Sequence, residues 1–228
     1  KIKETRENEK KETNCLTTSA PINFHKIKSD RRLRVATYNV RSMIHAGKRE
    51  MLELWAKKSN IDIALLQETK INLAGVEKRK HYTIFFSENE NIKDESGNTC
   101  QYTYAGVAIM IKHNLIDTIM EINPRDDRLM SITLRGSVHT TFINCYMETA
   151  ENSDRNHERY NLLGEQLNKY KKLGPTFIGG DMNARIQQGL EMDSETIVGK
   201  FTFDKNYPDD AKDEGIQLNR ELLIGFCA

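Results

Sequence analysis

The sequence is poor in cysteine and has no long apolar run, and each shortage excludes a class of protein. Its 228 residues include four cysteines, which lie far apart and form no Cys-x-x-Cys pair. A disulfide framework and a zinc site built on paired cysteines are therefore not expected. The uncharged stretch from Thr99 to Ile111 is too short to cross a bilayer. We accordingly expect no membrane partner.

Markers of secretion are missing as well. The sequence has no Asn-x-Ser/Thr glycosylation site and no recognisable signal peptide. Together with the unpaired cysteines, this favours a reducing, intracellular compartment. The chain begins without Met and ends within a predicted helix, so we expect it to be a fragment of a longer protein.

The net charge is close to zero, so the overall charge points to no class of partner. Its formal value is +1, with 38% hydrophobic and 29% charged residues. Basic residues are concentrated at the start, where ten Lys or Arg stand against five Asp or Glu between Lys1 and Arg34. We interpret residues 1–31 as a flexible basic tail, either a contact for a polyanion or a solvated linker. Residues 32–228 then form one domain.

Short apolar and β-branched runs predict a domain rich in strands. The expected strands are Leu33–Val40, Ile61–Leu66, Tyr82–Ser87, Tyr102–Lys112, Ile116–Ile122, Leu129–Leu134, Val138–Met147 and the run that ends at Gly180. The four consecutive runs between Tyr102 and Met147 predict an antiparallel meander.

Helical periodicity marks three further segments. They are Lys48–Lys58, Ser153–Leu173 and Ile216–Phe226. Trp55 is expected to pack in the core with its apolar neighbours on the first helix, and Ser153 or Asp154 to cap the second. Residues 186–206 show no clear period and predict a loop.

Polar side chains follow four of the expected strands. Asp181 and Asn183 come after an apolar run that ends in two glycines, and in an extended chain their side chains point the same way. An Asx-turn is the simpler interpretation of this pair. Asn39, Glu68 and Tyr146 lie at the ends of three other strands. If these strands belong to facing sheets, all five side chains line one cleft.

Carboxylate, amide and phenol groups together suit phosphodiester hydrolysis assisted by Mg²⁺, with Mn²⁺ as the alternative ion. Mg²⁺ usually binds one or two carboxylates together with water and substrate phosphate. Glu68 is the expected metal ligand, Asp181 the residue that holds the attacking water, and Asn183 and Tyr146 the donors to phosphate oxygens. Each residue also has an ordinary structural explanation, as a turn former, a surface acid or a core aromatic.

Four short motifs occur in order along the chain. They are Tyr38-Asn39-Val40, Leu66-Gln67-Glu68-Thr69-Lys70, Asn144-Cys145-Tyr146 and Gly180-Asp181-Met182-Asn183-Ala184. Together they resemble the endonuclease/exonuclease/phosphatase family, which includes DNase I-like enzymes and apurinic endonucleases. The resemblance spans about Arg32 to Ala228. It is closest to the endonuclease domain at the N-terminus of non-LTR retrotransposon polyproteins.

The resemblance implies an α+β fold of two packed, mainly antiparallel β-sheets flanked by helices, a four-layer α/β/β/α sandwich. It implies Mg²⁺-dependent phosphodiester hydrolysis with Glu68 and Asn39 at the metal. The cations Arg41 and Lys70, beside these two residues, are expected to bind substrate. The retrotransposon enzymes nick target DNA, and the new 3′-hydroxyl primes reverse transcription. We therefore expect DNA and a reverse transcriptase domain as partners, and a nuclear location.

The sequence departs from the family pattern in two places. Glu148 stands two residues after the tyrosine, where the family usually has Pro, which leaves the shape of that loop open. No His follows Asn183, so the closing Ser-Asp-His motif of the family and its C-terminal strands are missing. Two other functions stay open: a phosphatase of the same family acting on inositol phosphates or sphingolipids, and a catalytically silent binding fragment.

We predict that this chain alone is weakly active or inactive as a nuclease, because a general acid–base group typically contributes about 10²–10⁴-fold to the rate. The measurement is the conversion of supercoiled plasmid to nicked circles in Mg²⁺. Nicking at rates normal for the family would contradict the prediction.

Overall fold

The computed structural model describes residues 32–72, 74–88, 93, 95–98, 100, 102–186 and 213–228. The predicted tail at residues 1–31 and most of the predicted loop at 186–206 lie outside the described residues, so both stay predictions. None of the described helices has the length and apolar character needed to cross a membrane.

The first sheet contains five strands in the order β1-β2-β5-β4-β3. Only β1 and β2 run parallel, and the other neighbours are antiparallel. The predicted strands formed, and the short edge strand β3 was not predicted. The bounds are β1 Val35–Asn39, β2 Ile63–Gln67, β3 Gly75–Lys78, β4 Tyr82–Phe86 and β5 Val107–Lys112.

The second sheet contains four strands in the order β6-β7-β8-β9. The first three form an antiparallel meander, and β9 joins β8 in parallel. A parallel pair needs a crossover, which the long helix α2 supplies. The bounds are β6 Ile119–Pro124, β7 Leu129–Leu134, β8 Thr140–Tyr146 and β9 Thr176–Asp181.

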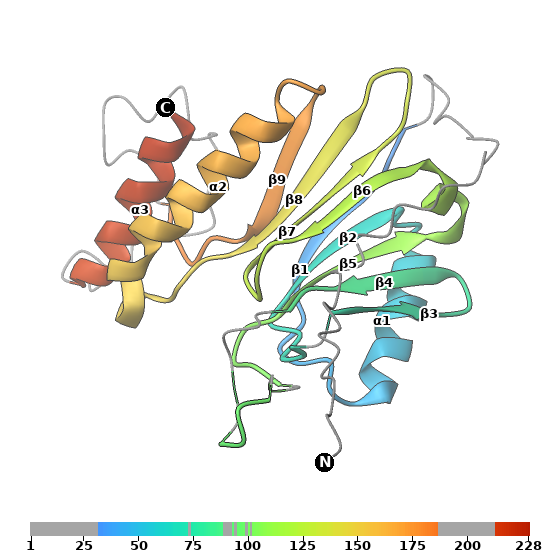
Figure 1. Ribbon diagram of the computed structural model, residues 1–228, viewed down its shortest axis with the longest axis horizontal. Helices are drawn as coiled ribbons and strands as arrows, with labels where there is room; N and C mark the ends of the chain where they lie inside the picture. Colours follow the sequence, from blue (N-terminus) through green and yellow to red (C-terminus); the bar gives the residue numbers. More distant parts are fainter. Residues whose placement is uncertain are drawn as a thin grey trace, which may run out of the picture.

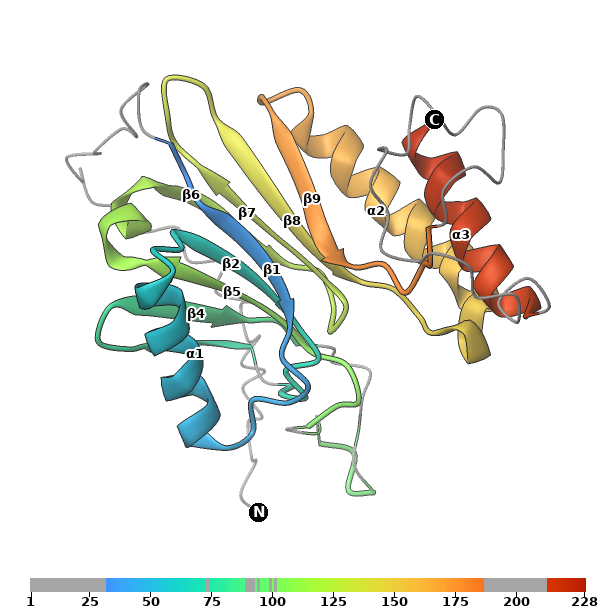
Figure 2. The same cartoon turned by 180° about the vertical axis from the view of Figure 1, so that it is seen from behind.

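Helices cover the outer faces of both sheets, which gives four layers (Figures 1 and 2). α1 packs on the first sheet, and α2 and α3 pack on the second. The predicted α+β sandwich of two packed sheets flanked by helices is confirmed. The helical bounds are α1 Ala46–Lys58, η1 His113–Thr118, η2 Ala150–Arg155, α2 Asn156–Tyr170 and α3 Glu214–Cys227.

Three hydrophobic clusters lie between the four layers and pack them together. The largest lies between the sheets, where fully buried residues such as Ile109 of β5 meet Ile132 of β7. A second joins the first sheet to Leu52 and Ala56 of α1, and a third joins the second sheet to α2 and α3. Apolar burial contributes roughly 25 cal/mol per Å², so these clusters supply most of the stabilisation of the fold.

Several sequence-based expectations about the elements were wrong in detail. The segment before β6 is a 3₁₀ helix, closed by the Thr118 hydroxyl donating to the Leu115 carbonyl at 2.6 Å. The predicted four-stranded meander has three strands, because β5 joins the other sheet. Ser153 and Asp154 lie within η2, and α2 has no side-chain cap.

Trp55 was also wrongly predicted as a core residue. It is 38% exposed and its ring lies 5.4 Å from that of Tyr38 on β1. The buried face of α1 instead includes Leu52, Glu53 and Ala56. The helix therefore packs Leu52, Ala56 and the ion-paired Glu53 inward and leaves Trp55, its largest apolar residue, at the edge.

Asn144 on β8 ties the two sheets together at the level of the strand ends. Its amide accepts from Gln67 Nε2 at 2.7 Å and donates to the carbonyls of Leu66 and Ala108, both at 2.9 Å. Asn144 is fully buried and Gln67 is 1% exposed. Buried polar groups need such partners, so this contact fixes how β8 sits on β2 and β5.

We predict that Asn144→Ala lowers the free energy of unfolding by about 1–3 kcal/mol or more, because it leaves buried carbonyls and the Gln67 amide without their partner. Urea denaturation followed by circular dichroism measures the change. Asn168→Ala, at an exposed position of α2, is the matched control and should stay within about 0.5 kcal/mol. Equal effects of the two substitutions would contradict the role given to Asn144.

Candidate active site

The predicted site residues come from strand ends that the two sheets bring to one edge. Asn39 ends β1 and Glu68 follows β2, which runs parallel to it. Tyr146 ends β8 and Asp181 ends β9, its parallel neighbour. The carboxyl ends of parallel strands meet at the same edge, and the packing of the sheets faces one pair with the other.

Hydrogen bonds join four of these residues across the two sheets. Asn39 Nδ2 donates to Glu68 Oε1 at 2.7 Å and to Asp181 Oδ2 at 2.9 Å. The Tyr146 hydroxyl donates to the same Glu68 oxygen at 3.0 Å. The structure therefore places both carboxylates, the amide and the phenol in a single cluster, as the sequence analysis expected of strands in facing sheets.

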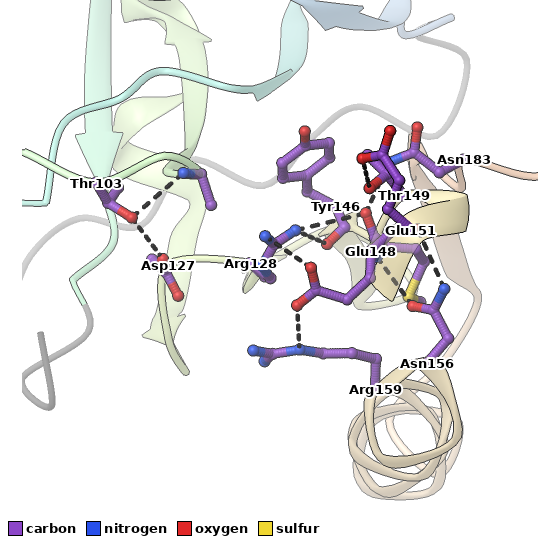
Figure 3. Close-up of polar contacts among 12 residues, drawn as sticks. Thr103, Asp127, Arg128, Tyr146, Glu148, Thr149, Glu151, Asn156, Arg159 and Asn183 are labelled. Atoms are coloured by element: carbon purple, nitrogen blue, oxygen red, sulfur yellow. Dashed lines mark hydrogen bonds and ion pairs between the residues drawn. The ribbon is translucent and has the colours of Figure 1, made fainter. Parts of the chain in front are cut away.

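Asn183 lies beside the cluster, but its side chain points to the backbone. Its amide Nδ2 donates to the Met147 carbonyl at 2.7 Å (Figure 3). Its backbone N–H donates to Asp181 Oδ1 at 3.0 Å. The second contact is the Asx-turn that the sequence analysis gave as the simpler interpretation. The Met147 carbonyl takes one of the two N–H groups of the Asn183 amide, so the other is the one that could donate to a substrate phosphate.

Arg41 and Lys70 lie in the loops that follow β1 and β2. Arg41 touches the cluster through its backbone, since its N–H donates to Asn39 Oδ1 at 3.1 Å. The Lys70 N–H donates to the Ala105 carbonyl at 2.9 Å. The structure thus brings both cations to the edge where the cluster lies, and their contact with substrate stays a prediction.

The backbone is strained around this cluster. Six described non-glycine residues have positive φ, and five of them lie in the loops at the strand ends. Glu68 has φ 53° and Asn183 has φ 46°, in a region that non-glycine residues rarely adopt. Such residues cost about 1–3 kcal/mol each and gather at functional sites. At its positive φ the backbone of Glu68 leaves the direction of β2, and the Glu68 side chain contacts Asn39.

The two glycines before Asp181 allow β9 to approach its neighbours. A Cβ at Gly180, whose φ is 157°, would collide with the Cys145 carbonyl of β8. A Cβ at Gly179 would lie 2.8 Å from the Leu65 side chain of the other sheet. Larger residues would push β9 outward, and Asp181 would lose its contact with Asn39.

A groove opens beside the cluster. It has a volume of about 400 Å³ and is lined by the end of β1, by Gln67 and by the end of β9 with residues 182–185. Asn39 and Asp181 both face it. A phosphate-sized group in this groove would reach the Asn39 amide and the Asp181 carboxylate.

Burial and neighbouring charge keep the Tyr146 phenol protonated. Removal of the hydroxyl from water raises the pKa of Tyr146 to about 12, and the Glu68 carboxylate adds to the effect through charge and hydrogen bonding. The Arg128 guanidinium opposes the shift. Tyr146 is therefore a hydrogen-bond donor throughout the neutral range.

The donor set of the cluster fits a hard divalent cation. Among the described residues no group of three or more His, Cys, Asp or Glu is arranged to hold a metal, which excludes a site built on those residues alone. Two carboxylates share one amide nitrogen, and a divalent ion would relieve their repulsion. Mg²⁺ accepts such sparse protein ligation because it keeps several waters. Asn39 now presents its nitrogen to the acids, so its oxygen would bind a metal only after the amide turns.

Sequence reasoning missed two residues that support the cluster. Arg128 lies with its guanidinium 4.8 Å from the centre of the Tyr146 ring. Glu148, noted only as a departure from a motif, pairs with Arg128 at 2.9 Å. No local pattern links positions 128 and 148, because the contact forms only when β7 and β8 pair.

A two-sheet sandwich with an acid, an amide and a phenol at paired strand ends defines a class of phosphate-ester hydrolases. The chain belongs to the Endonuclease/Exonuclease/phosphatase family, whose model matches residues 36–205. Members of this family are nucleases and phosphodiesterases, so the membership supports hydrolase activity in general terms.

Known proteins show the same fold. An AP endonuclease from Archaeoglobus fulgidus matches with a TM-score of 0.57 at 19% identity, over 86% of this chain and 70% of that one. A 3′ phosphatase from Neisseria, solved with product DNA hairpin, matches with a TM-score of 0.50 at 16% identity, over 84% of this chain and 71% of that one. Craniofacial development protein 2 of Bos taurus is 26% identical over 198 residues, 85% of this chain. The chain spans about 29% of the length of that relative.

The pKa of Tyr146 leads to a prediction about alkaline stability. A folded-state pKa near 12, above the usual value of about 10, gives stability that is complete below pH 10 and lost as the pH rises toward 12. Tyr146→Phe should therefore lose less stability than the wild type between pH 9 and 11 in urea denaturation. Tyr104→Phe, at a position 93% exposed, should follow the wild type. The same pH dependence in all three proteins would refute the assignment.

Proposed function

We propose that the chain is the metal-dependent phosphodiesterase domain of a DNA-nicking endonuclease. The observation that carries the proposal is the Asn39 amide, which joins Glu68 of one sheet to Asp181 of the other at 2.7 and 2.9 Å. A carboxylate for a cation and a carboxylate for water, fixed beside one groove, are the groups that phosphodiester hydrolysis requires.

Glu68 is the residue that would hold Mg²⁺, with the Asn39 oxygen beside it after the amide turns. Both contacts of the Glu68 carboxylate with described side chains use Oε1, so Oε2 is the oxygen to offer to the ion. Bound Mg²⁺, or Mn²⁺ with the same oxygen ligands, would supply positive charge to the phosphate. We assign Arg41 and Lys70 to further phosphate contacts at the groove edge.

The protein's own groups divide the remaining work. Asp181 lines the groove and can accept a proton from the attacking water or hold that water in line. The protonated Tyr146 hydroxyl now donates its one proton to Glu68, and after it turns from Glu68 it can donate to a phosphate oxygen as negative charge develops. Asn183 would add a second donor through the N–H of its amide that the Met147 carbonyl does not use.

DNA is the proposed substrate, and a non-LTR retrotransposon polyprotein with a reverse transcriptase domain is the proposed parent. The support is the order and the residues of the four sequence motifs, together with the likeness in fold to an AP endonuclease. A nuclear location follows from a DNA target.

Plasmid nicking tests the function. At high protein concentration and long incubation, the wild type should convert supercoiled DNA to open circles only when Mg²⁺ is present. Glu68→Gln and Asp181→Asn should each lower this rate by about 10²–10⁴-fold, because each removes a group that acts on the reacting phosphate. Isothermal titration should show Mg²⁺ binding that Glu68→Gln abolishes.

Glu121→Gln is the control for these two variants, since this acid pairs with Lys169 on the surface of β6. It should nick at the wild-type rate. Nicking that persists in Glu68→Gln, or that needs no divalent ion, would refute the proposed function. Release of phosphate from inositol phosphates or sphingolipids in place of plasmid nicking would transfer it to the phosphatase branch of the family.

A further inference from the structure

Glu148 is a buried acid to which the proposed chemistry gives no role. It is 5% exposed and lies two residues after Tyr146, where the chain leaves β8. Its carboxylate pairs with Arg128 Nη2 at 2.9 Å and lies 3.8 Å from Arg159 Nε (Figure 3). A buried carboxylate is costly unless it is paired, so the position of these cations depends on Glu148.

Arg128 in turn lies directly against Tyr146. Its guanidinium is 4.8 Å from the ring centre, a distance that favours a cation on an aromatic face. Its Nη1 also points to the carbonyls of Tyr146 and Met147, at 3.4 and 3.5 Å. The Tyr146 N–H donates to the Arg128 carbonyl at 2.9 Å. Arg128 therefore supports the tyrosine through both its ring and its backbone.

The pair belongs to a charge-balanced set of two arginines and two acids. Arg159 Nη1 contacts Asp126 Oδ2 at 2.6 Å, and Asp126 Oδ1 accepts from the Arg128 N–H at 2.8 Å. The members of this set come from the turn between β6 and β7, from the loop after β8 and from α2. Removal of the Glu148 charge would leave the Arg128 guanidinium without its nearest anion and free it to turn away from the ring.

The backbone of Glu148 is fixed independently of its carboxylate. Its N–H donates to Asn156 Oδ1 at 2.9 Å, and its carbonyl accepts from Asn156 and Asn219, both at 3.1 Å. Both asparagines are fully buried. A substitution that changes only the end of the Glu148 side chain keeps these contacts, so it tests the carboxylate alone.

We infer that Glu148 is a positioning residue: its carboxylate holds Arg128 under the Tyr146 ring, and Arg128 directs the phenol to Glu68. The catalytic consequence rests on the proposed function, whereas the positional claim does not. Glu148→Gln should lower kcat on the order of 10–100-fold, the scale of a misplacement near 1 Å, and change KM by less than about twofold.

A double-mutant cycle with Tyr146→Phe separates positioning from a structural role. If Glu148 acts through the phenol, Glu148→Gln should have little further effect once that hydroxyl is gone. Glu53→Gln is the matched control, because Glu53 is also a buried acid paired with an arginine, Arg79 at 3.3 Å, but lies on α1. It should leave kcat unchanged in both backgrounds. An equal loss from Glu148→Gln in both backgrounds would overturn the inference.

NMR of protein labelled with ¹³C-tyrosine tests the positional claim without any activity. The Tyr146 ring signal, assigned by its loss in Tyr146→Phe, should shift in Glu148→Gln and stay in place in Glu53→Gln. An unshifted signal in folded Glu148→Gln would overturn the inference even if the enzyme is active. If the wild type neither nicks plasmid nor binds Mg²⁺ in a way that Glu68→Gln abolishes, the proposed function fails, and this shift still decides the positional claim. If Glu148→Gln does not fold, Arg128→Lys replaces it, with the same expected shift.

Discussion

One amide nitrogen lies between two carboxylates that belong to different sheets. Asn39 Nδ2 donates to Glu68 and to Asp181, and the two acids would otherwise face each other with like charge. Charge-assisted hydrogen bonds of this kind are about twice as strong as neutral ones. The contact therefore offsets part of the repulsion and also joins β1 and β2 to β9. The same contact fixes the packing of the sheets and leaves a concentration of negative charge that suits a divalent cation.

The rest of the fold holds this contact in place against local strain. Glu68 and Asn183 adopt positive φ, and at Gly180 the chain passes too close to the Cys145 carbonyl for any side chain. Strain persists only where the surroundings over-determine the conformation. Here the cluster between the sheets and the Asn144 contact supply that constraint one residue away from Glu68. The packed core thus holds the strand ends in their irregular conformation.

The sequence predicted those parts of the fold and site that depend on local pattern. Apolar runs marked the strands, and polar residues at their ends marked Asn39, Glu68 and Asp181, because strand ends meet at sheet edges. Tertiary contacts decided what it could not predict. Leu52 and Ala56 pack on the first sheet while Trp55 lies at the rim, and β5 pairs with β2 and β4 instead of β6. No local sequence pattern predicts such packing or strand pairing.

Glu148 holds the loop after β8 through both its backbone and its carboxylate. Proline would restrict φ locally and would remove a backbone donor. Glu148 instead keeps its N–H, which donates to Asn156, and its carbonyl accepts from Asn219 of α3. Its carboxylate adds the pair with Arg128. Contacts with two helices and with Arg128, which lies just before β7, thus hold this loop, so the placement of Tyr146 depends on how α2 and α3 dock on the second sheet.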